Sequence, residues 1–116
     1  MMARDVLFLL EPLFHDNGRK EYCPECAEIW GVLSYFPDIK TRLDIRYQPI
    51  EKPRTELQSL LGSENQNCPT LVLSETSQNV EHSGIVSANG VRFIDNARGI
   101  GQYFAQRFGT PFPRGG

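Results

Sequence analysis

Two cysteines three residues apart are the side chains in this sequence best suited to chemistry. Cys23-Pro24-Glu25-Cys26 comes between a short apolar run and a segment with helical periodicity. Pro24 suits the first turn of a helix, where its missing N–H would have had no partner inside the helix. Cys23 is therefore expected at the helix cap, where unpaired N–H groups stabilise a thiolate. This arrangement is typical of thiol–disulfide exchange, in which Cys23 attacks and Cys26 resolves the mixed disulfide.

Two other uses of the cysteines remain open. The same C-x-x-C spacing occurs in zinc sites, which need four ligands. The sequence holds no second C-x-x-C, and only His15 and His82 remain as nitrogen donors. Both histidines stand alone in polar segments, so we expect them on the surface. A third cysteine, Cys68, precedes a proline, and a buried thiol packed as a small apolar residue is the alternative to a functional role there.

The elements that position the cysteines follow from hydrophobic periodicity. Residues 6–10 form an apolar block, which predicts a strand covered on both faces. Residues 13–22 contain turn chemistry and no lasting period, so a loop is expected there. Apolar side chains at spacings of three and four predict a helix from residue 24 to residue 36, ended by Pro37.

The rest of the sequence predicts two more strands, one hairpin and two helices. Alternation over residues 43–47 indicates a strand with one wet face, and Pro53 opens a short helix that Gly62 ends. A strand follows at residues 70–74. Asn89-Gly90 is a tight-turn signal that pairs residues 85–88 with 91–94. Asp95 or Asn96 then caps a helix over residues 97–108. The leading strand-helix-strand unit predicts a parallel pair, with antiparallel strands added at the far edge.

Three segments carry a resemblance to known families. Residues 20–26, Lys-Glu-Tyr-Cys-Pro-Glu-Cys, resemble the K-x-Y-C-P-x-C motif of glutaredoxins, within the thioredoxin-like superfamily. Residues 67–72 resemble the segment that enters a strand with a cis-proline facing the cysteine pair. Residues 93–100 resemble the start of a helix in glutathione transferase N-terminal domains. The chain is also similar to a small family of bacterial thioredoxin-like proteins, from which only a fold carries over.

The resemblance spans residues 6–109 and implies a fold. That fold is an α/β, thioredoxin-like (glutaredoxin-type) domain with a mixed four-stranded sheet and helices on both faces. Cys23 would be the nucleophile, Cys26 the resolving thiol and Pro69 the cis residue that shapes the substrate groove. Side chains implied to bind the substrate or glutathione are Lys20, Tyr22, Cys68, Pro69, Asp95 and Asn96.

Each implied contact has a plain alternative. A lysine meets a carboxylate as a point charge, but Lys20 beside Arg19 is also ordinary loop charge. Asp95 would accept from an α-amino group, and the alternative is that Asp95 or Asn96 only caps the last helix. With these contacts, glutathione is the expected co-substrate and no cofactor is bound tightly. The expected partner is glutathione or a protein thiol or disulfide.

Cys68 is the main departure from the glutaredoxin pattern. If Pro69 faces the cysteine pair, Cys68 lies within a few ångströms of Cys23, with its side chain at the lip of the site. Three sulfurs could then exchange disulfides, or hold zinc, copper(I) or an iron–sulfur centre with an external ligand. The chain is thus expected to be a thiol–disulfide oxidoreductase. The alternatives are a non-catalytic glutathione- or thiol-binding module and a metal-binding protein using Cys23, Cys26 and Cys68.

Composition bounds the remaining classes. The chain has 116 residues, is 40% apolar and carries a net charge of −2, which suits one domain over residues 1–116. A loop insertion is expected at 75–89 and a flexible tail at 110–116. Its 12 basic side chains are scattered among 14 acidic ones, which argues against nucleic acid as a partner. The longest apolar run is too short to span a membrane. An odd number of cysteines favours a reducing compartment, and we expect the cytoplasm.

Overall fold

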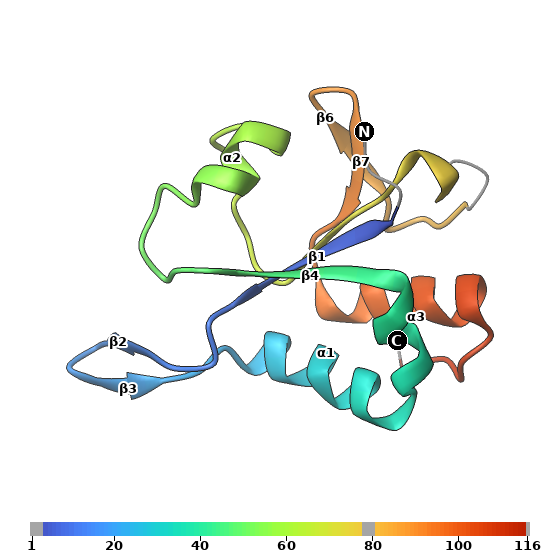
Figure 1. The fold of residues 1–116 in the computed structure, drawn as a ribbon, viewed down its shortest axis with the longest axis horizontal. Helices are drawn as coiled ribbons and strands as arrows, with labels where there is room; N and C mark the ends of the chain where they lie inside the picture. Colours follow the sequence, from blue (N-terminus) through green and yellow to red (C-terminus); the bar gives the residue numbers. More distant parts are fainter. Residues whose placement is uncertain (1–3, 78–80, 116) are drawn as a thin grey trace.

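A five-stranded mixed sheet organises the α/β fold (Figure 1), which the computed structural model describes over residues 4–77 and 81–115. The strand order is β4-β1-β5-β7-β6. The strands are β1 (Asp5–Leu10), β4 (Leu43–Gln48), β5 (Thr70–Val72), β6 (Val86–Ala88) and β7 (Val91–Ile94). β1 is parallel to β4 and antiparallel to β5, while β7 is antiparallel to β5 and β6. The parallel pair and the antiparallel far edge were both predicted from the sequence.

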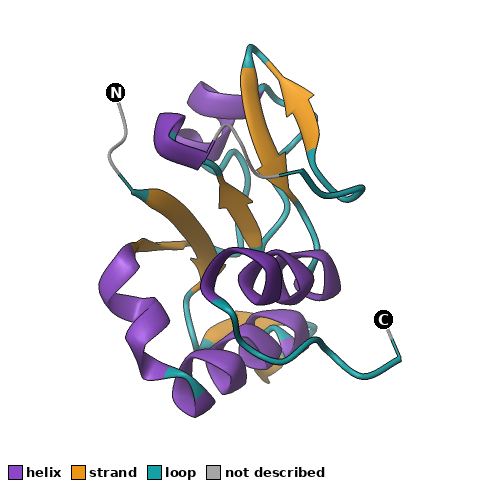
Figure 2. Ribbon diagram, turned by 90° about the vertical axis from the view of Figure 1, so that its right-hand side faces the viewer, coloured by secondary structure: helices purple, strands orange, loops and turns teal. Residues whose placement is uncertain are grey.

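Helices cover both faces of the sheet. α1 (Pro24–Tyr35) and α3 (Ala97–Phe108) lie on one side of β1, and α2 (Thr55–Leu61) lies on the other (Figure 1). Figure 2 looks along α1 and α3, which pack side by side. All six residues of β1 are buried, as a strand covered on both faces requires. The largest fully buried apolar side chains include Phe8, Leu9, Ile29, Leu33, Leu57, Leu71, Ile94, Ile100 and Phe104.

The two long helices match their predicted limits. Cys23 caps α1, and Pro24 occupies its first turn. Asn96 caps α3, which ends at Gly109 in the left-handed conformation with φ 77°. α2 begins two residues later than predicted, because Arg54 has extended backbone and stands at its N-cap. A 3₁₀ helix, η1 (Pro37–Arg42), follows α1 and was not predicted.

The sheet has one strand more than the four expected. β6 pairs with β7 across a tight turn in which Asn89 has φ 52° and Gly90 has φ 73°. This hairpin was predicted from Asn89-Gly90, but its outer strand was not counted as part of the sheet. β6 lies at the sheet edge and is mostly exposed, with Val86 45% exposed. Its sequence therefore lacks the alternation of buried and exposed side chains that would identify a sheet strand.

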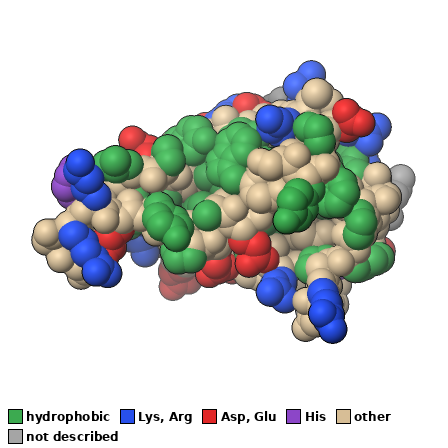
Figure 3. Space-filling model, turned by 90° about the horizontal axis from the view of Figure 1, so that it is seen from below, with side chains coloured by type: hydrophobic (Ala, Val, Ile, Leu, Met, Phe, Trp, Pro, Cys, Tyr) green, Lys and Arg blue, Asp and Glu red, His purple; other side chains and the backbone are tan. Residues whose placement is uncertain are grey.

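A second hairpin occupies residues 13–22, where a loop was expected. β2 (Phe14–Asp16) pairs with β3 (Arg19–Glu21) across Asn17 and Gly18, which have φ 54° and 71°. The prediction missed it because both strands are short and mostly polar, and they pair with each other and not with the main sheet, although Phe14 packs against the core. The hairpin projects from the body in Figure 1, and Figure 3 shows its Lys, Arg and His side chains at the left-hand end.

Two segments lie partly outside the described residues. The expected insertion at 75–89 includes η2 (Glu75–Ser77) and β6, but residues 78–80 are not described. The expected tail at 110–116 is described up to residue 115. There the Arg98 guanidinium donates to the Arg114 carbonyl oxygen at 3.2 Å. Pro113 packs beside Gly101, where an added Cβ would lie only 2.9 Å from the proline ring.

A buried carboxylate fixes the start of β1. Asp5 is 3% exposed and accepts from the Ser74 N–H at 2.8 Å and the Ser77 hydroxyl at 2.7 Å. Its other oxygen accepts from the Tyr103 hydroxyl at 2.6 Å. Because these donors come from the segment after β5 and from α3, one side chain joins three parts of the fold.

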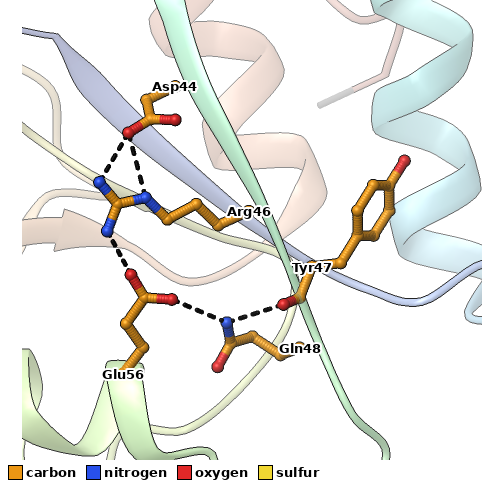
Figure 4. Close-up of polar contacts among 5 residues, drawn as sticks. All are labelled: Asp44, Arg46, Tyr47, Gln48 and Glu56. Atoms are coloured by element: carbon orange, nitrogen blue, oxygen red, sulfur yellow. Dashed lines mark hydrogen bonds and ion pairs between the residues drawn. The ribbon is translucent and has the colours of Figure 1, made fainter.

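An exposed ion-pair network covers the outer edge strand β4 (Figure 4). The Arg46 guanidinium contacts the carboxylates of Asp44, at 2.7 Å, and of Glu56 on α2. The Gln48 side chain donates to Glu56 at 3.3 Å. Charged side chains of this kind protect an unpaired edge from adding another strand. Tyr47 points the other way in Figure 4, toward α1.

Candidate active site

Cys23 lies where its predicted role requires. It is partly exposed, and its sulfur accepts from the Cys26 N–H at 3.3 Å, which is a side-chain N-cap of α1. The cap residue has extended backbone, with φ −83° and ψ 115°, and Pro24 continues into the helix. An N–H donor and the positive end of the helix dipole therefore face the sulfur, and both stabilise a thiolate more than a thiol.

Cys26 lies below Cys23, one turn inside the helix. It is 5% exposed, and its sulfur accepts from the Leu10 N–H at 3.4 Å, at the end of β1. Burial raises the pKa of the Cys26 thiol, and the neighbouring Cys23 sulfur raises it further, while the Leu10 N–H opposes the rise. All three cysteines are free thiols in the structure. The pair therefore consists of one accessible sulfur and one protected sulfur, as the proposed roles of attack and resolution require.

Cys68 contributes its backbone to the site and its side chain to the core. The Cys68–Pro69 peptide bond is cis, as the resemblance implied, and the Cys23 thiol donates to the Cys68 carbonyl oxygen at 3.9 Å. The expectation of a side chain at the lip is wrong, because Cys68 is 6% exposed and Pro69 is also buried. β5, which begins two residues later, lies in the middle of the sheet with every residue buried, and the Cys68 side chain packs in the same core.

Arg54 is a buried cation near Cys68 that sequence reasoning did not identify. It is 6% exposed, and its guanidinium donates to the carbonyl oxygens of Pro49, Ile50 and Gln66 at 2.9, 2.8 and 2.7 Å. Burial raises the pKa of Cys68 to about 11, and the Arg54 charge opposes that rise. No sequence pattern marks such a residue, since an arginine before a short helix is usually exposed.

The described residues give the metal-binding alternative no ligand set. Across residues 4–77 and 81–115, no group of three or more His, Cys, Asp or Glu side chains could hold a metal ion. Cys23, Cys26 and Cys68 are all in this range and do not form one. In the same part of the chain, no helix has the length and apolar character needed to cross a bilayer.

The comparison with known proteins gives one family. The model of the family described as "Protein of unknown function (DUF3088)" matches residues 4–112. The chain belongs to the DUF3088 family. No curated protein and no solved structure matches it. The matched residues include the whole sheet, α1 to α3 and all three cysteines, so the site described above belongs to the part that the DUF3088 model covers.

The side chains implied to bind glutathione are only partly brought together in this DUF3088 protein. Lys20 is exposed on the projecting hairpin, opposite His15. Asp95 is exposed, and Asn96 caps α3 by accepting from the Gly99 N–H at 2.7 Å. Asn96 is therefore the cap of α3, one of the two residues predicted for that position. Tyr22, by contrast, stands directly beside Cys23 and is 63% exposed.

A hollow of about 280 Å³ opens next to the cysteine pair and was not predicted. It lies between the end of β1, the end of β4 and the first turns of α1. Tyr22, Trp30 and Tyr47 form its aromatic wall, and both Cys23 and Cys26 line it. Trp30 belongs to the apolar spacing that predicts the helix over residues 24–36, and Tyr47 to the alternation over residues 43–47, so both were expected to face the core. Tyr47 is 45% exposed instead, because the β4 edge ends over this hollow.

Proposed function

We propose that the DUF3088 chain has a thioredoxin-like fold. The order β4-β1-β5-β7, with β1 and β4 parallel and the other neighbours antiparallel, supports this assignment. So does the placement of the cysteine pair at the start of the helix that follows β1. On this reading, β6 and the β2–β3 hairpin are additions to a four-stranded core.

We propose further that the protein carries out thiol–disulfide exchange. The observation that supports this most directly is Cys23 at the N-cap of α1, accessible, accepting a backbone N–H, with Cys26 buried beneath it. The three free thiols and their odd number are consistent with a reducing compartment, which we propose to be the cytoplasm. A binding module that recognises glutathione without reacting is less well supported, because Lys20 is exposed on the hairpin and does not line the hollow beside Cys23, while the Asn96 side chain caps α3.

The proposed reaction proceeds in two steps. The Cys23 thiolate attacks a substrate disulfide, R–S–S–R′, forming Cys23–S–S–R and releasing R′–S⁻, which takes up a proton. Cys26 then loses its proton and attacks the Cys23 sulfur, which releases R–S⁻ and leaves a Cys23–Cys26 disulfide. The substrate gains two electrons and the protein loses two. An external dithiol reverses the protein's change by the same exchange and is itself oxidised to a disulfide.

The environment of Cys26 sets the order of these steps. Burial, and then the neighbouring Cys23 sulfur, raise the pKa of Cys26, so Cys26 stays protonated and does not compete for the substrate. Once Cys23 is part of a mixed disulfide, its negative charge is gone and this part of the rise disappears. The Leu10 N–H remains at the Cys26 sulfur and stabilises the resolving thiolate.

Reduction of bis(2-hydroxyethyl) disulfide by dithiothreitol, with and without the protein, tests this proposal. We expect the protein to accelerate the reaction, Cys23→Ser to lose the acceleration, and Cys26→Ser to accumulate an adduct on Cys23 that peptide mapping locates. Cys68→Ala is the matched variant, because it removes the third thiol and should still form the Cys23–Cys26 disulfide on oxidation. Full activity of Cys23→Ser, or an adduct on Cys68, would overturn the proposal.

A further inference from the structure

The aromatic hollow beside Cys23 is large enough for a substrate group. Its volume of about 280 Å³ is lined mainly by Leu10, Pro12, Tyr22, Trp30 and Tyr47, with the two cysteines in the same wall. A molecule joined to the Cys23 sulfur therefore has an apolar space directly next to the new bond. Pockets of this kind bury apolar parts of a ligand and orient the rest.

The exposure of the aromatic wall indicates that something covers it. Tyr22 is 63% and Tyr47 45% exposed, although rings of this size usually bury most of their surface. Figure 3 shows hydrophobic side chains gathered on this face, to the right of the charged hairpin. A cluster of exposed aromatic side chains around one hollow, unlike scattered single residues, marks a binding surface.

The charges around the hollow are unfavourable for an acidic ligand. Glu11 is the one carboxylate in the wall, and no Lys or Arg lines it. Lys40 lies 5.7 Å from the Trp30 ring centre but does not line the hollow. On the hairpin, the Arg19 guanidinium is held by Glu21 at 2.8 Å. The residues that line the hollow therefore carry one negative charge and no positive charge, and Lys20 lies outside the lining, on the exposed hairpin.

The chain's own carboxylate occupies the start of α3. A helix N-terminus attracts anions because its first N–H groups have no partner in the helix. Here Glu25, inside the cysteine motif, accepts from the Ala97 N–H at 3.3 Å, and Asn96 accepts from the Gly99 N–H. A substrate carboxylate that entered this position would have to displace Glu25 and would meet its charge there.

We propose that the substrate is a neutral or cationic disulfide whose cysteine carries an adjacent aromatic or other apolar group, and that the site disfavours glutathione. The apolar group fills the hollow while the substrate sulfur bonds to Cys23. This inference rests on the proposed thiol–disulfide exchange and names its substrate class. The mixed disulfide forms by the same balanced step given above, with an external dithiol as reductant.

Competing disulfide probes test the inference. The probes are glutathione disulfide and the symmetric disulfides of N-acetyl-Cys-Phe-amide and N-acetyl-Cys-Ala-amide. The second-order rate of adduct formation on Cys23 is measured in Cys26→Ser by mass spectrometry and divided by the rate of each probe with N-acetylcysteine. We expect the Phe probe to react at least about tenfold faster than glutathione disulfide, since partial burial of one ring stabilises by about 1.5 kcal/mol.

Matched variants separate the hollow from the cysteines. Tyr47→Ala should remove most of the preference for Phe over Ala. Tyr35→Ala should keep the preference for Phe over Ala. Tyr35 is also an exposed tyrosine, but it lies on α1 and does not line the hollow. Glu11→Gln and Glu25→Gln should each raise the glutathione rate severalfold. Circular dichroism and thermal unfolding check that each variant is folded.

The outcomes distinguish the two proposals. If no probe reacts with Cys23, the proposed thiol–disulfide exchange fails. If all probes react at similar corrected rates, or if Tyr47→Ala slows every probe equally, exchange stands and the substrate inference is overturned. Faster reaction of glutathione disulfide than of the Phe probe would overturn it as well.

Discussion

Removal of the Asp5 carboxylate should destabilise the fold strongly, although Asp5 lies at the opposite end of β1 from the cysteines. Asp5→Ala takes the charged acceptor from the Ser74 N–H, the Ser77 hydroxyl and the Tyr103 hydroxyl. A hydrogen bond to a charged group contributes about 1.5–3 kcal/mol, and rotation of the serine hydroxyl recovers part of the loss. We therefore expect the free energy of unfolding to fall by about 3–5 kcal/mol.

Tyr103→Phe provides the second side of a double-mutant cycle. Tyr103 is fully buried and donates to one Asp5 oxygen, so this variant loses a single charged hydrogen bond, about 1.5–3 kcal/mol. The two substitutions should not be additive, with a coupling energy of about 1–2 kcal/mol. Asp44→Ala is the control, because Asp44 pairs only with an exposed arginine and should change stability by at most about 1 kcal/mol.

Urea denaturation at constant pH measures these differences. For a domain of this size, a loss of 3–5 kcal/mol lowers the melting temperature by roughly 12–20 °C. A cost below about 1 kcal/mol for Asp5→Ala, or a coupling energy near zero, would refute the argument that the buried carboxylate joins β1 to α3.

The pKa of Tyr103 gives the same network a pH dependence. Burial, and then the hydrogen bond to Asp5, raise the pKa of Tyr103 above its usual 10.0. A raised pKa in the folded state means that stability is complete below pH 10 and declines as pH rises, because the unfolded chain releases its proton first. Wild type should therefore lose stability above pH 10 more steeply than Tyr103→Phe, by up to about 1.4 kcal/mol per pH unit. Parallel slopes for both proteins would contradict this.

Three further predictions concern the site and its supports. Arg54→Met should cost about 3 kcal/mol or more, because the buried Gln66 carbonyl oxygen and the part-buried carbonyl oxygens of Pro49 and Ile50 lose a charged donor. Arg46→Met at the exposed edge should cost at most about 1 kcal/mol, and equal costs by urea denaturation would be inconsistent with this. Burial raises the pKa of Cys26, so release of the second thiol from the mixed disulfide should accelerate about tenfold per pH unit from pH 6 to 8. A stopped-flow rate that does not change with pH would show that Cys26 does not resolve the mixed disulfide. Gly99→Ala places a Cβ 2.8 Å from Ile94 and should destabilise the fold by about 1–3 kcal/mol. Gly31→Ala, in open space on α1, should stabilise it by about 0.5–1 kcal/mol. A higher melting temperature for Gly99→Ala than for Gly31→Ala would argue against both estimates.

The sequence predicted best what depends on neighbours along the chain. Cys23 as a helix cap, α1 ending before Pro37 and α3 capped by Asn96 each follow from local geometry, and the structure has all three. The parallel pairing of β1 with β4 followed from one rule about strand-helix-strand units. These features need no knowledge of what packs against them.

Features that depend on distant residues were missed. The sequence gives no sign that Arg54 is buried, because its partners lie in two loops that meet only in the folded chain. Glu25 lies inside the cysteine motif, yet its carboxylate accepts from the N–H of Ala97, 72 residues later. The alternation over residues 43–47 predicted Tyr47 on the covered face of the strand, but Tyr47 is 45% exposed beside a hollow that arises where three elements end. Cys68 was placed at the lip because its backbone is there, while its side chain is not.

The β2–β3 hairpin makes the connection between β1 and α1 tolerant of changes in length. Its turn at Asn17-Gly18 is exposed, and its two strands hydrogen-bond to each other rather than to the sheet. Residues added or removed at that turn would lengthen or shorten the hairpin while Pro12 and Tyr22, at its base, stay beside Cys23. A reporter peptide or fluorophore can therefore be inserted at this turn to follow substrate capture from a fixed distance, without rebuilding the site that it observes.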